Sequence, residues 1–184
     1  MSMSAGVRVK RGLFLDRDGV LTKSLVRRGR PFAPRALEEF EILPEAALEL
    51  PLFKAADFII IVVTNQPDLA AGLLSQTTLD EMHRRLLAAL PIDEIVVCPC
   101  QEADPECTCY KPRPGMLLET ATRWQIDLGR SFMVGDRWRD IGAGRAAGCR
   151  TVFLDRGYEH DPRPENPDYV VSSLRSVREF ILSS

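Results

Sequence analysis

Short apolar runs and longer amphipathic stretches alternate along the chain. The clearest run, residues 58–63 (FIIIVV), is almost entirely β-branched, which is typical of a strand buried on both faces. The other predicted strands are residues 12–15, 92–97, 131–134, 150–154 and 169–171. Strands of this kind need helices to cover both faces of their sheet.

Helical patterns lie between the predicted strands. In residues 77–90, apolar residues such as Leu79, Met82 and Leu86 recur three or four positions apart, and Pro91 ends the helix. Further helices are predicted over residues 114–124, 139–147 and at the C-terminus. Because strands that alternate with helices are typical of parallel sheets, we expect an α/β fold, a three-layer Rossmann-like parallel sheet with helices on both faces.

Two segments depart from this alternation. Residues 20–44 are rich in arginine and broken by prolines, which indicates a flap rather than a regular element. Pro51 lies inside an otherwise helical stretch, where it removes a hydrogen-bond donor, so we expect that helix to be kinked or split. The chain contains no repeat, low-complexity tract or linker, so residues 1–184 are expected to form one domain.

The composition excludes several classes of protein. The 184 residues carry 24 basic and 26 acidic side chains, a formal net charge of −2, whereas bulk binding to nucleic acid needs a basic excess. The longest apolar run falls far short of the ~20 residues that span a membrane. The N-terminus shows no signal-peptide pattern. We therefore expect a globular, cytoplasmic protein that binds neither nucleic acid nor membranes.

Four of the five cysteines are crowded into residues 98–109. A secreted disulfide framework would spread its cysteines along the chain, whereas a cluster in one loop is typical of a metal site in a reducing compartment. Four thiolates favour tetrahedral Zn²⁺ held by protein ligands alone, as in a structural site. The candidate zinc ligands are Cys98, Cys100, Cys107 and Cys109. Free thiols or a redox pair are the alternatives, and Cys149 is expected to be an ordinary buried residue.

Polar side chains follow several predicted strands, at the edge where open α/β sheets bind ligands. These side chains are Asp16, Asp18, Thr64, Asn65, Asp136 and Asp140. Lys111, which follows the cysteine loop, is expected to join them. Three or four carboxylates in one crevice repel one another unless a cation neutralises them. Oxygen ligands suit a hard divalent ion, above all Mg²⁺. Asp140 has a simpler alternative role, because it could cap the helix that follows.

A crevice that also holds a lysine and a hydroxyl is suited to phosphate, because metal and ammonium offset the charge of the phosphoryl oxygens. An aspartate could then attack phosphorus and form an aspartyl-phosphate. A second aspartate, two residues on, could protonate the leaving alcohol and later take a proton from the attacking water. Asp16 and Asp18 have this spacing.

These residues resemble the four motifs of the haloacid dehalogenase superfamily, in the family's order. The run DRDGV from Asp16 resembles the first motif, and Thr64 resembles the second. Lys111 resembles the third motif, and GDRWRD from Gly135 resembles the fourth. The resemblance implies a Mg²⁺-dependent phosphohydrolase.

The resemblance also implies a role for each residue. Asp16 would be the nucleophile and a metal ligand, and Asp18 would be the general acid/base, with its backbone carbonyl on the metal. Thr64 would bind the phosphoryl group, and Lys111 would steady both that group and Asp16. Asp136 would bind Mg²⁺.

Within the superfamily, the chain most resembles the histidinol-phosphate and heptose-bisphosphate phosphatase family. The likeness rests on FLDRDGV, TNQ, the cysteine loop, KPRPGM from Lys111 and MVGDRWRD. Asp140 would either ligate Mg²⁺ directly or support the residues that do. Members are small and lack a large cap domain, and their zinc loop usually has a histidine where this chain has Cys100. The resemblance therefore implies a capless fold with a small zinc-binding loop.

The choice of substrate depends on fewer residues. Heptose-bisphosphate phosphatases usually carry arginines where this chain has Ala71 and Tyr110. Arg113 or a basic cluster in the flap could replace their contacts with the phosphate that is not cleaved. The flap cluster comprises Lys23, Arg27, Arg28, Arg30 and Arg35, and the candidate substrate-binding residues are Thr64, Asn65, Lys111 and Arg113. A heptose 1,7-bisphosphate cleaved at its 7-phosphate is the first expectation, and histidinol phosphate or another sugar phosphate stays open.

Two other functions fit parts of the pattern. A phosphotransferase or mutase could use the same aspartyl-phosphate, but it would need a cap or second domain to exclude water. A zinc-stapled binding module with a vestigial site would need neither a nucleophile at Asp16 nor an acid at Asp18. We expect a phosphatase that acts as a monomer on a small phosphorylated metabolite. His83 and His160 are assigned no role.

Overall fold

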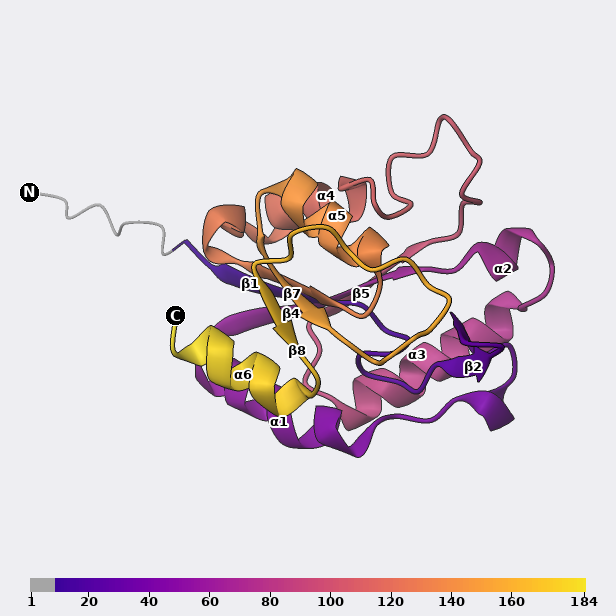
Figure 1. The fold of residues 1–184 in the computed structure, drawn as a ribbon, viewed down its shortest axis with the longest axis horizontal. Coiled ribbons are helices and arrows are strands. Elements are labelled where there is room, and N and C mark those ends of the chain that lie inside the picture. Colours follow the sequence, from indigo (N-terminus) through magenta and orange to yellow (C-terminus); the bar gives the residue numbers. More distant parts are fainter. Residues whose placement is uncertain (1–8) are drawn as a thin grey trace, which may run out of the picture.

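The computed structural model of the chain describes residues 9–184. Its main feature is a six-stranded parallel sheet with the order β5-β4-β1-β6-β7-β8 (Figure 1). The strands are β1 (Arg11–Leu15), β4 (Phe58–Asn65), β5 (Glu94–Cys98), β6 (Phe132–Gly135), β7 (Arg150–Leu154) and β8 (Tyr169–Val171). The N-terminal segment, for which the sequence shows no signal-peptide pattern, lies mostly outside the described residues.

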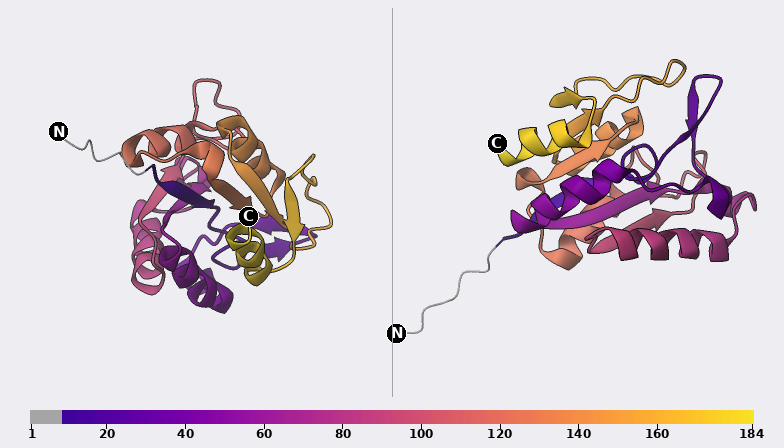
Figure 2. Two further views of the ribbon diagram at one scale, coloured as in Figure 1. Left: turned by 90° about the vertical axis from the view of Figure 1, so that its left-hand side faces the viewer. Right: turned by 90° about the horizontal axis from the view of Figure 1, so that it is seen from below.

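Helices cover both faces of this sheet (Figures 1 and 2). On one face lie α1 (Pro44–Ala55), α3 (Gln76–Ala89) and α6 (Leu174–Leu182), and on the other lie α4 (Gly115–Trp124) and α5 (Trp138–Ala147). Shorter elements are α2 (Pro67–Ala70) and the 3₁₀ turns η1 (Leu37–Glu39) and η2 (Leu128–Arg130). The arrangement confirms the predicted three-layer α/β fold. None of the helices in residues 9–184 has the length and apolarity to cross a membrane.

The strands are apolar on both sides because each face of the sheet is covered. In β1, Leu13 and Leu15 pack on the side of α1 and α6, whereas Phe14 packs on the side of α4 and α5. In β4, Ile60 faces the first side and Ile61 the second, and all five side chains are fully buried. Burial of such a side chain contributes roughly 1.5–3 kcal/mol. A two-sided core therefore explains the unbroken apolar runs of the sequence.

β1 lies inside the sheet, at the point where the strand order reverses. From β1 the chain adds β4 and β5 on one side and then returns to add β6, β7 and β8 on the other. Open α/β sheets bind ligands at such a point, beyond the carboxyl ends of the strands. Leu15 pairs with both Val62 and Val134, so β1, β4 and β6 end side by side. The residues that follow these strands are thereby brought together.

The segment predicted to be a flap, residues 20–44, contains short regular elements. β2 (Leu25–Arg27) and β3 (Arg30–Phe32) form an antiparallel hairpin, which η1 follows. Arg28 and Gly29 make the turn with positive φ angles. The right-hand view of Figure 2 shows the hairpin projecting at the end of the molecule away from the C-terminus.

Pro51 does not split its helix. α1 runs without interruption from Pro44 to Ala55, so the expected split is wrong. Proline lacks the N–H that would bond to the carbonyl of Ala47, four residues earlier. Both Ala47 and Pro51 are exposed, so this carbonyl can bond to water instead.

Candidate active site and cysteine cluster

Three carboxylates meet where β1 and β6 end. Asp16 directly follows β1, Asp136 directly follows β6, and Asp140 lies in the first turn of α5. Carboxylate oxygens from all three lie within 4.8 Å of one another. Asp136 and Asp140 are each 1% exposed, and Asp16 is 8% exposed. The structure thus brings together three residues that the sequence places at strand ends or one turn later.

The ammonium group of Lys111 lies among these carboxylates. Its Nζ is 2.7 Å from Asp16 Oδ1 and 2.6 Å from Asp140 Oδ1, and it donates to the carbonyl of Val63 at 2.8 Å. Burial alone would lower the pKa of Lys111, but Asp140 and Asp16 raise it above its ordinary value. Lys111 therefore stays protonated, as one buried positive charge facing three carboxylates.

Asn65 holds the backbone of Lys111 in place. Its Oδ1 accepts a hydrogen bond from Lys111 N at 3.0 Å, and its Nδ2 donates to Lys111 O at 3.2 Å. Asn65 also lines the cleft described below. Because both ends of its amide are used in this way, the structure places Asn65 as a support for the lysine. This use differs from the contact with substrate that the sequence led us to expect for Asn65.

The carboxylates outnumber the lysine, and their pKa values show the imbalance. Burial and the nearby charges of Asp140 and Asp18 raise the pKa of Asp16 to about 6, although Lys111 opposes the shift. Burial, with repulsion from Asp16 and Asp140, raises the pKa of Asp136 well above its ordinary range. A bound cation would supply the missing positive charge and stabilise the ionised carboxylates.

The oxygen atoms available here fit a hard divalent cation. Asp136 Oδ1 is buried without a hydrogen-bond partner, while Oδ2 accepts a bond from the Tyr158 hydroxyl at 2.7 Å. Oxygen-only ligand sets suit Mg²⁺. Both oxygens of Asp140 are engaged, one by Lys111 and one by a backbone N–H at the start of α5. Asp16 and Asp136 are therefore the better-placed ligands, with Asp140 supporting them.

Gly19 allows this close packing of the loop after β1. Its φ of +93° lies in the region that favours glycine, and a Cβ there would overlap the Asp136 carboxylate. Tyr158, the partner of Asp136, comes from the loop after β7, where no sequence motif marks it. Burial and the neighbouring Asp136 raise the pKa of Tyr158, so its hydroxyl stays a donor.

The Asp18 carboxylate is not part of the carboxylate cluster described above. Arg17 donates to it through Nε and Nη2, the latter at 2.8 Å. Thr22 Oγ1 donates to it at 2.9 Å, and Gln66 Nε2 donates at 3.1 Å. Three side chains therefore fix this carboxylate in the wall of the cleft. The carboxylate of Asp18 is thus engaged by other side chains, and the metal ligand that the family resemblance implies for this residue is its backbone carbonyl.

Gln66, which was not among the residues expected from the sequence, links Asp18 to Thr64. Its Nε2 donates to Thr64 Oγ1 at 2.9 Å as well as to Asp18. Both Gln66 and Thr64 are 1% exposed. The only available signal was the TNQ triplet, in which Gln66 stands two residues after Thr64.

A cleft of about 290 Å³ opens over these groups. The hairpin contributes Pro31 and Phe32 to its lining, and Arg35 comes from the segment just beyond. Of the basic residues in the flap, Lys23 and Arg27 instead form ion pairs with glutamates in the same segment. The arginines that line the cleft are Arg35, Arg137 and Arg139. Each of these arginines also pairs with a carboxylate, in the order Asp68, Asp161 and Glu102, so arginine–carboxylate pairs surround the acidic floor of the cleft.

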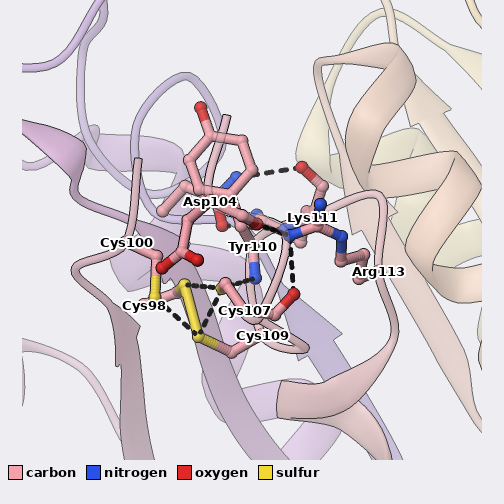
Figure 3. The surroundings of a disulfide bond; sticks show 9 residues. Cys98, Cys100, Asp104, Cys107, Cys109, Tyr110, Lys111 and Arg113 are labelled. Carbon is pink, nitrogen blue, oxygen red and sulfur yellow. Dashed lines mark hydrogen bonds between the residues drawn. A yellow bond between two sulfur atoms is a disulfide. The ribbon is translucent and has the colours of Figure 1, made fainter. Parts of the chain in front are cut away.

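The sulfur atoms of the four clustered cysteines lie within 4.8 Å of one another (Figure 3). Cys98 and Cys109 are joined as a disulfide. Other Sγ–Sγ distances are 3.6 Å from Cys98 to Cys107, 3.8 Å from Cys100 to Cys109 and 3.5 Å from Cys107 to Cys109. Thiolates about 2.3 Å from a tetrahedral Zn²⁺ would lie about 3.8 Å apart. The cluster is therefore compatible with a zinc-binding loop once the disulfide is reduced.

Arg113 belongs to the cysteine loop rather than to the cleft. Its Nη1 donates to the carbonyls of Asp104 at 2.8 Å and Cys107 at 2.6 Å (Figure 3). The described residues that line the cleft do not include Arg113, whereas they do include Tyr110. The structure thus places Arg113 as a support for the loop, away from the substrate contact that the sequence suggested.

Comparisons with known proteins show which families the chain is similar to. Residues 108–177 match the family model described as HAD-hydrolase-like. The chain is 34% identical over 182 residues to the D-glycero-β-D-manno-heptose-1,7-bisphosphate 7-phosphatase of Escherichia coli strain K12, covering 92% of each chain. It is 33% identical over 150 residues to the enzyme of the same name from Bordetella bronchiseptica, covering 79% of this chain and 80% of the relative.

A solved structure extends the likeness to the fold and to a ligand pair. The D,D-heptose 1,7-bisphosphate phosphatase of B. bronchiseptica, complexed with magnesium and phosphate, superposes with a TM-score of 0.78 at 31% identity. The match covers 94% of this chain and 98% of that one. The chain therefore belongs to the haloacid dehalogenase-like phosphatases, in the family of histidinol-phosphate and heptose 1,7-bisphosphate phosphatases, and is a phosphoric monoester hydrolase.

Proposed function

We propose that the protein hydrolyses the 7-phosphate of D-glycero-D-manno-heptose 1,7-bisphosphate in a Mg²⁺-dependent reaction. The observation that carries this proposal is the buried contact of Lys111 with Asp16 and Asp140, beside the unpartnered Oδ1 of Asp136. A lysine next to a carboxylate nucleophile can hold the phosphoryl oxygens during attack. The choice of sugar follows the relatives, which are named for this substrate.

Asp16 is the nucleophile in this reaction. One carboxylate oxygen attacks phosphorus, the bond from phosphorus to the sugar oxygen breaks, and an aspartyl-phosphate forms. Asp18, in its protonated form, gives its proton to the departing sugar oxygen. A water molecule then attacks phosphorus, Asp18 takes the proton of that water, and the bond to Asp16 breaks to release phosphate. Lys111 balances the charge of the phosphoryl oxygens in both steps.

Asp16, Asp136 and the backbone carbonyl of Asp18 would hold the Mg²⁺, with Asp140 behind them. When bound, the ion neutralises the carboxylates and draws charge from the phosphoryl group. The proposal is supported by the unpartnered oxygen of Asp136 and by the magnesium in the solved relative.

Arg139 is the best-placed side chain for the phosphate that is not cleaved. It lines the cleft, and its Nε is buried without a hydrogen-bond partner. Its Nη2 pairs with Glu102 of the cysteine loop, which holds the side chain at the rim. A guanidinium group matches the geometry of phosphate oxygens. This contact would replace the contacts that related phosphatases make through arginines at the positions of Ala71 and Tyr110.

We expect Arg139→Gln to raise KM for the heptose bisphosphate by about 10-fold or more, because a hydrogen bond to a charged group is worth about 1.5–3 kcal/mol. The kcat should change little, since Arg139 does not contact the reacting groups. Steady-state kinetics on the bisphosphate and on the 7-monophosphate measure both constants. Arg145→Gln, on the same helix but exposed, is the matched control. Equal increases in KM for both substrates would contradict this role.

Phosphate release over a panel of phosphomonoesters tests the proposed function. The panel contains both anomers of the heptose bisphosphate, histidinol phosphate, hexose phosphates and nucleotides, each with Mg²⁺ and with EDTA. A preference of about 100-fold in kcat/KM, worth about 2.7 kcal/mol, would identify the substrate. A preference for histidinol phosphate would move the protein to that activity, and no EDTA-sensitive release at all would favour the binding-module alternative.

We also propose that the cysteine loop holds a structural Zn²⁺. The Sγ–Sγ distances support it, as does the Tyr110 N–H that donates to Cys107 Sγ at 3.2 Å. Burial raises the pKa of Cys107, but hydrogen bonds from its neighbours outweigh burial and lower it overall, which favours a thiolate. Zinc would also order the chain that leads into Lys111.

The compartment and the oligomeric state belong to the same proposal. Reduced thiols fit a cytoplasmic protein. A cleft whose lining comes from one chain fits a monomer.

We expect protein purified under reducing conditions to contain about one zinc per chain, and Cys107→Ser to lose it. Loss of the metal should cost about 2 kcal/mol or more, which lowers Tm by roughly 5 °C. Elemental analysis and thermal unfolding measure the two effects. Cys149→Ala is the control, because Cys149 is a free cysteine outside the cluster. Zinc-free protein that keeps the Cys98–Cys109 disulfide under reducing conditions would contradict the zinc assignment.

A further inference from the structure

Arg17, between the two aspartates of the first motif, connects the site to a distant helix. Its side chain is fully buried. Nε and Nη2 bind the Asp18 carboxylate, and Nη1 lies 3.1 Å from His83 Nε2. The guanidinium carbon also lies 5.8 Å from the centre of the Phe40 ring. Each of the three guanidinium nitrogens therefore has a polar partner.

The contact defines the state of the His83 ring. Arginine only donates hydrogen bonds, so His83 Nε2 must accept this one. The ring is therefore neutral, with its proton on Nδ1. Burial, followed by the positive charge of Arg17, lowers the pKa of His83 to about 4, in agreement with a neutral ring at neutral pH.

His83 lies on a helix, outside the loop after β1 that carries Asp16 and Asp18. It lies in α3, a 14-residue helix whose first turn is capped by Ser75. Beside it, Leu79 and Met82 anchor α3 in a buried cluster with Leu74. The acceptor for Arg17 therefore lies on an element that is held in place by its own buried contacts.

We propose that His83 is a positioning residue for the general acid: by accepting from Arg17, it fixes the guanidinium that orients Asp18. The inference rests on the proposed function, in which Asp18 protonates the leaving oxygen. Without His83, Nη1 of Arg17 would be a buried donor without its acceptor, and such a group turns toward other acceptors. The Asp18 carboxylate would then keep Thr22 and Gln66 but lose the fixed guanidinium, the one charged group among its three partners.

A positioning role for the acid depends on the leaving group, whereas a general structural role does not. A sugar alkoxide is strongly basic and must be protonated as it departs. p-Nitrophenolate is a stable anion and leaves without a proton. Disturbing the acid should therefore slow transfer of the phosphoryl group from the heptose bisphosphate to Asp16 and spare its transfer from p-nitrophenyl phosphate. The later attack of water on the aspartyl-phosphate is the same for both substrates.

The experiment compares kcat/KM for these two substrates in full-length variants, because this constant reports the steps up to departure of the leaving group and not the later attack of water. His83→Leu removes the acceptor, and we expect about a 10-fold loss on the heptose bisphosphate with less than about a 2-fold loss on p-nitrophenyl phosphate. His83→Gln keeps an acceptor oxygen and should restore most of the lost rate. Arg84→Leu, at an exposed position on the same helix, should keep the wild-type ratio of the two rates.

Equal losses on both substrates in His83→Leu, or a glutamine variant no better than the leucine variant, would overturn the inference and leave the proposed function standing. Absence of wild-type hydrolysis on both substrates would overturn the proposed function and the inference with it. If His83→Leu does not fold, ¹⁵N shifts of the wild-type ring decide: a neutral Nδ1–H tautomer at pH 7 supports the inference, and a protonated ring refutes it.

Discussion

Asp16→Asn is expected to lower kcat by about 10⁴-fold or more without unfolding the protein. The asparagine amide has no anionic oxygen to attack phosphorus, so the aspartyl-phosphate cannot form. The side chain keeps its shape and size. Its partner Lys111 keeps two other contacts, with Asp140 and with the carbonyl of Val63. The buried lysine is therefore not left unpaired, and the fold persists.

The same variant should be more stable than the wild type when metal is absent. Burial raises the pKa of Asp16 from 3.8 to about 6, so the folded protein holds the proton more tightly than the unfolded chain does. The loss of folding stability caused by ionising Asp16 is therefore absent below about pH 4 and grows as the pH rises through about 6. Above that pH the loss stays constant. Asparagine carries none of this cost, so its advantage in Tm should appear between pH 4 and pH 7. Mg²⁺ should shrink it.

Two measurements on purified protein check these expectations. Phosphate release with Mg²⁺ gives kcat, and thermal unfolding at several pH values, with and without Mg²⁺, gives the stability difference. Asp80→Asn, at an exposed position of α3, is the control for loss of a carboxylate. Activity within 10-fold of the wild type would remove Asp16 from the nucleophile role. A stability difference that ignores pH would contradict the raised pKa.

Lys111→Met is expected to impair both stability and catalysis. Removing one partner of a buried ion pair typically destabilises a protein by about 3–5 kcal/mol, because the other charge stays buried without compensation. Here Asp16 and Asp140 would both lose their cation. The kcat should fall by about 10³-fold or more, since nothing then balances the charge of the phosphoryl oxygens. Low pH should restore part of the stability by protonating Asp16, whose pKa rises further without the lysine.

Urea unfolding and phosphate release measure the two effects of Lys111→Met. Lys54→Met is the matched control, since Lys54 pairs with Asp93 at 2.8 Å but its side chain is 35% exposed. Partly exposed pairs contribute about 1 kcal/mol or less. Similar destabilisation in the two variants would show that burial of the Lys111 cluster is not what makes it important.

The sheet and the position of the site could be predicted because both leave local signals. A strand covered on both faces is an unbroken apolar run, and its end is marked by an abrupt change to polar residues. Asp16, Thr64 and Asp136 each stand just at or after such a change. Since parallel strands end at the same edge, these residues had to be neighbours. No knowledge of distant contacts was needed.

The supporting side chains could not be predicted, because their roles depend on partners far away in the chain. Asn65 is recognised as a support only when Lys111 lies beside it, and Tyr158 only when Asp136 does. Arg113 shows the reverse case. Its charge suggested phosphate, but two loop carbonyls take up its guanidinium. The sequence shows which side chains can form hydrogen bonds, but it does not show which partner each side chain binds in the folded protein.

The internal position of β1 has a consequence for how the chain assembles. β1 is made first, yet both of its neighbours, β4 and β6, come later in the sequence. Contacts of such long sequence separation form slowly. Until β6 joins, β1 exposes an open edge that can pair with other chains. Asp16 likewise has no contact with Asp136 and Asp140 until then, so the cluster of three carboxylates is completed only after β6 and α5 have joined the sheet.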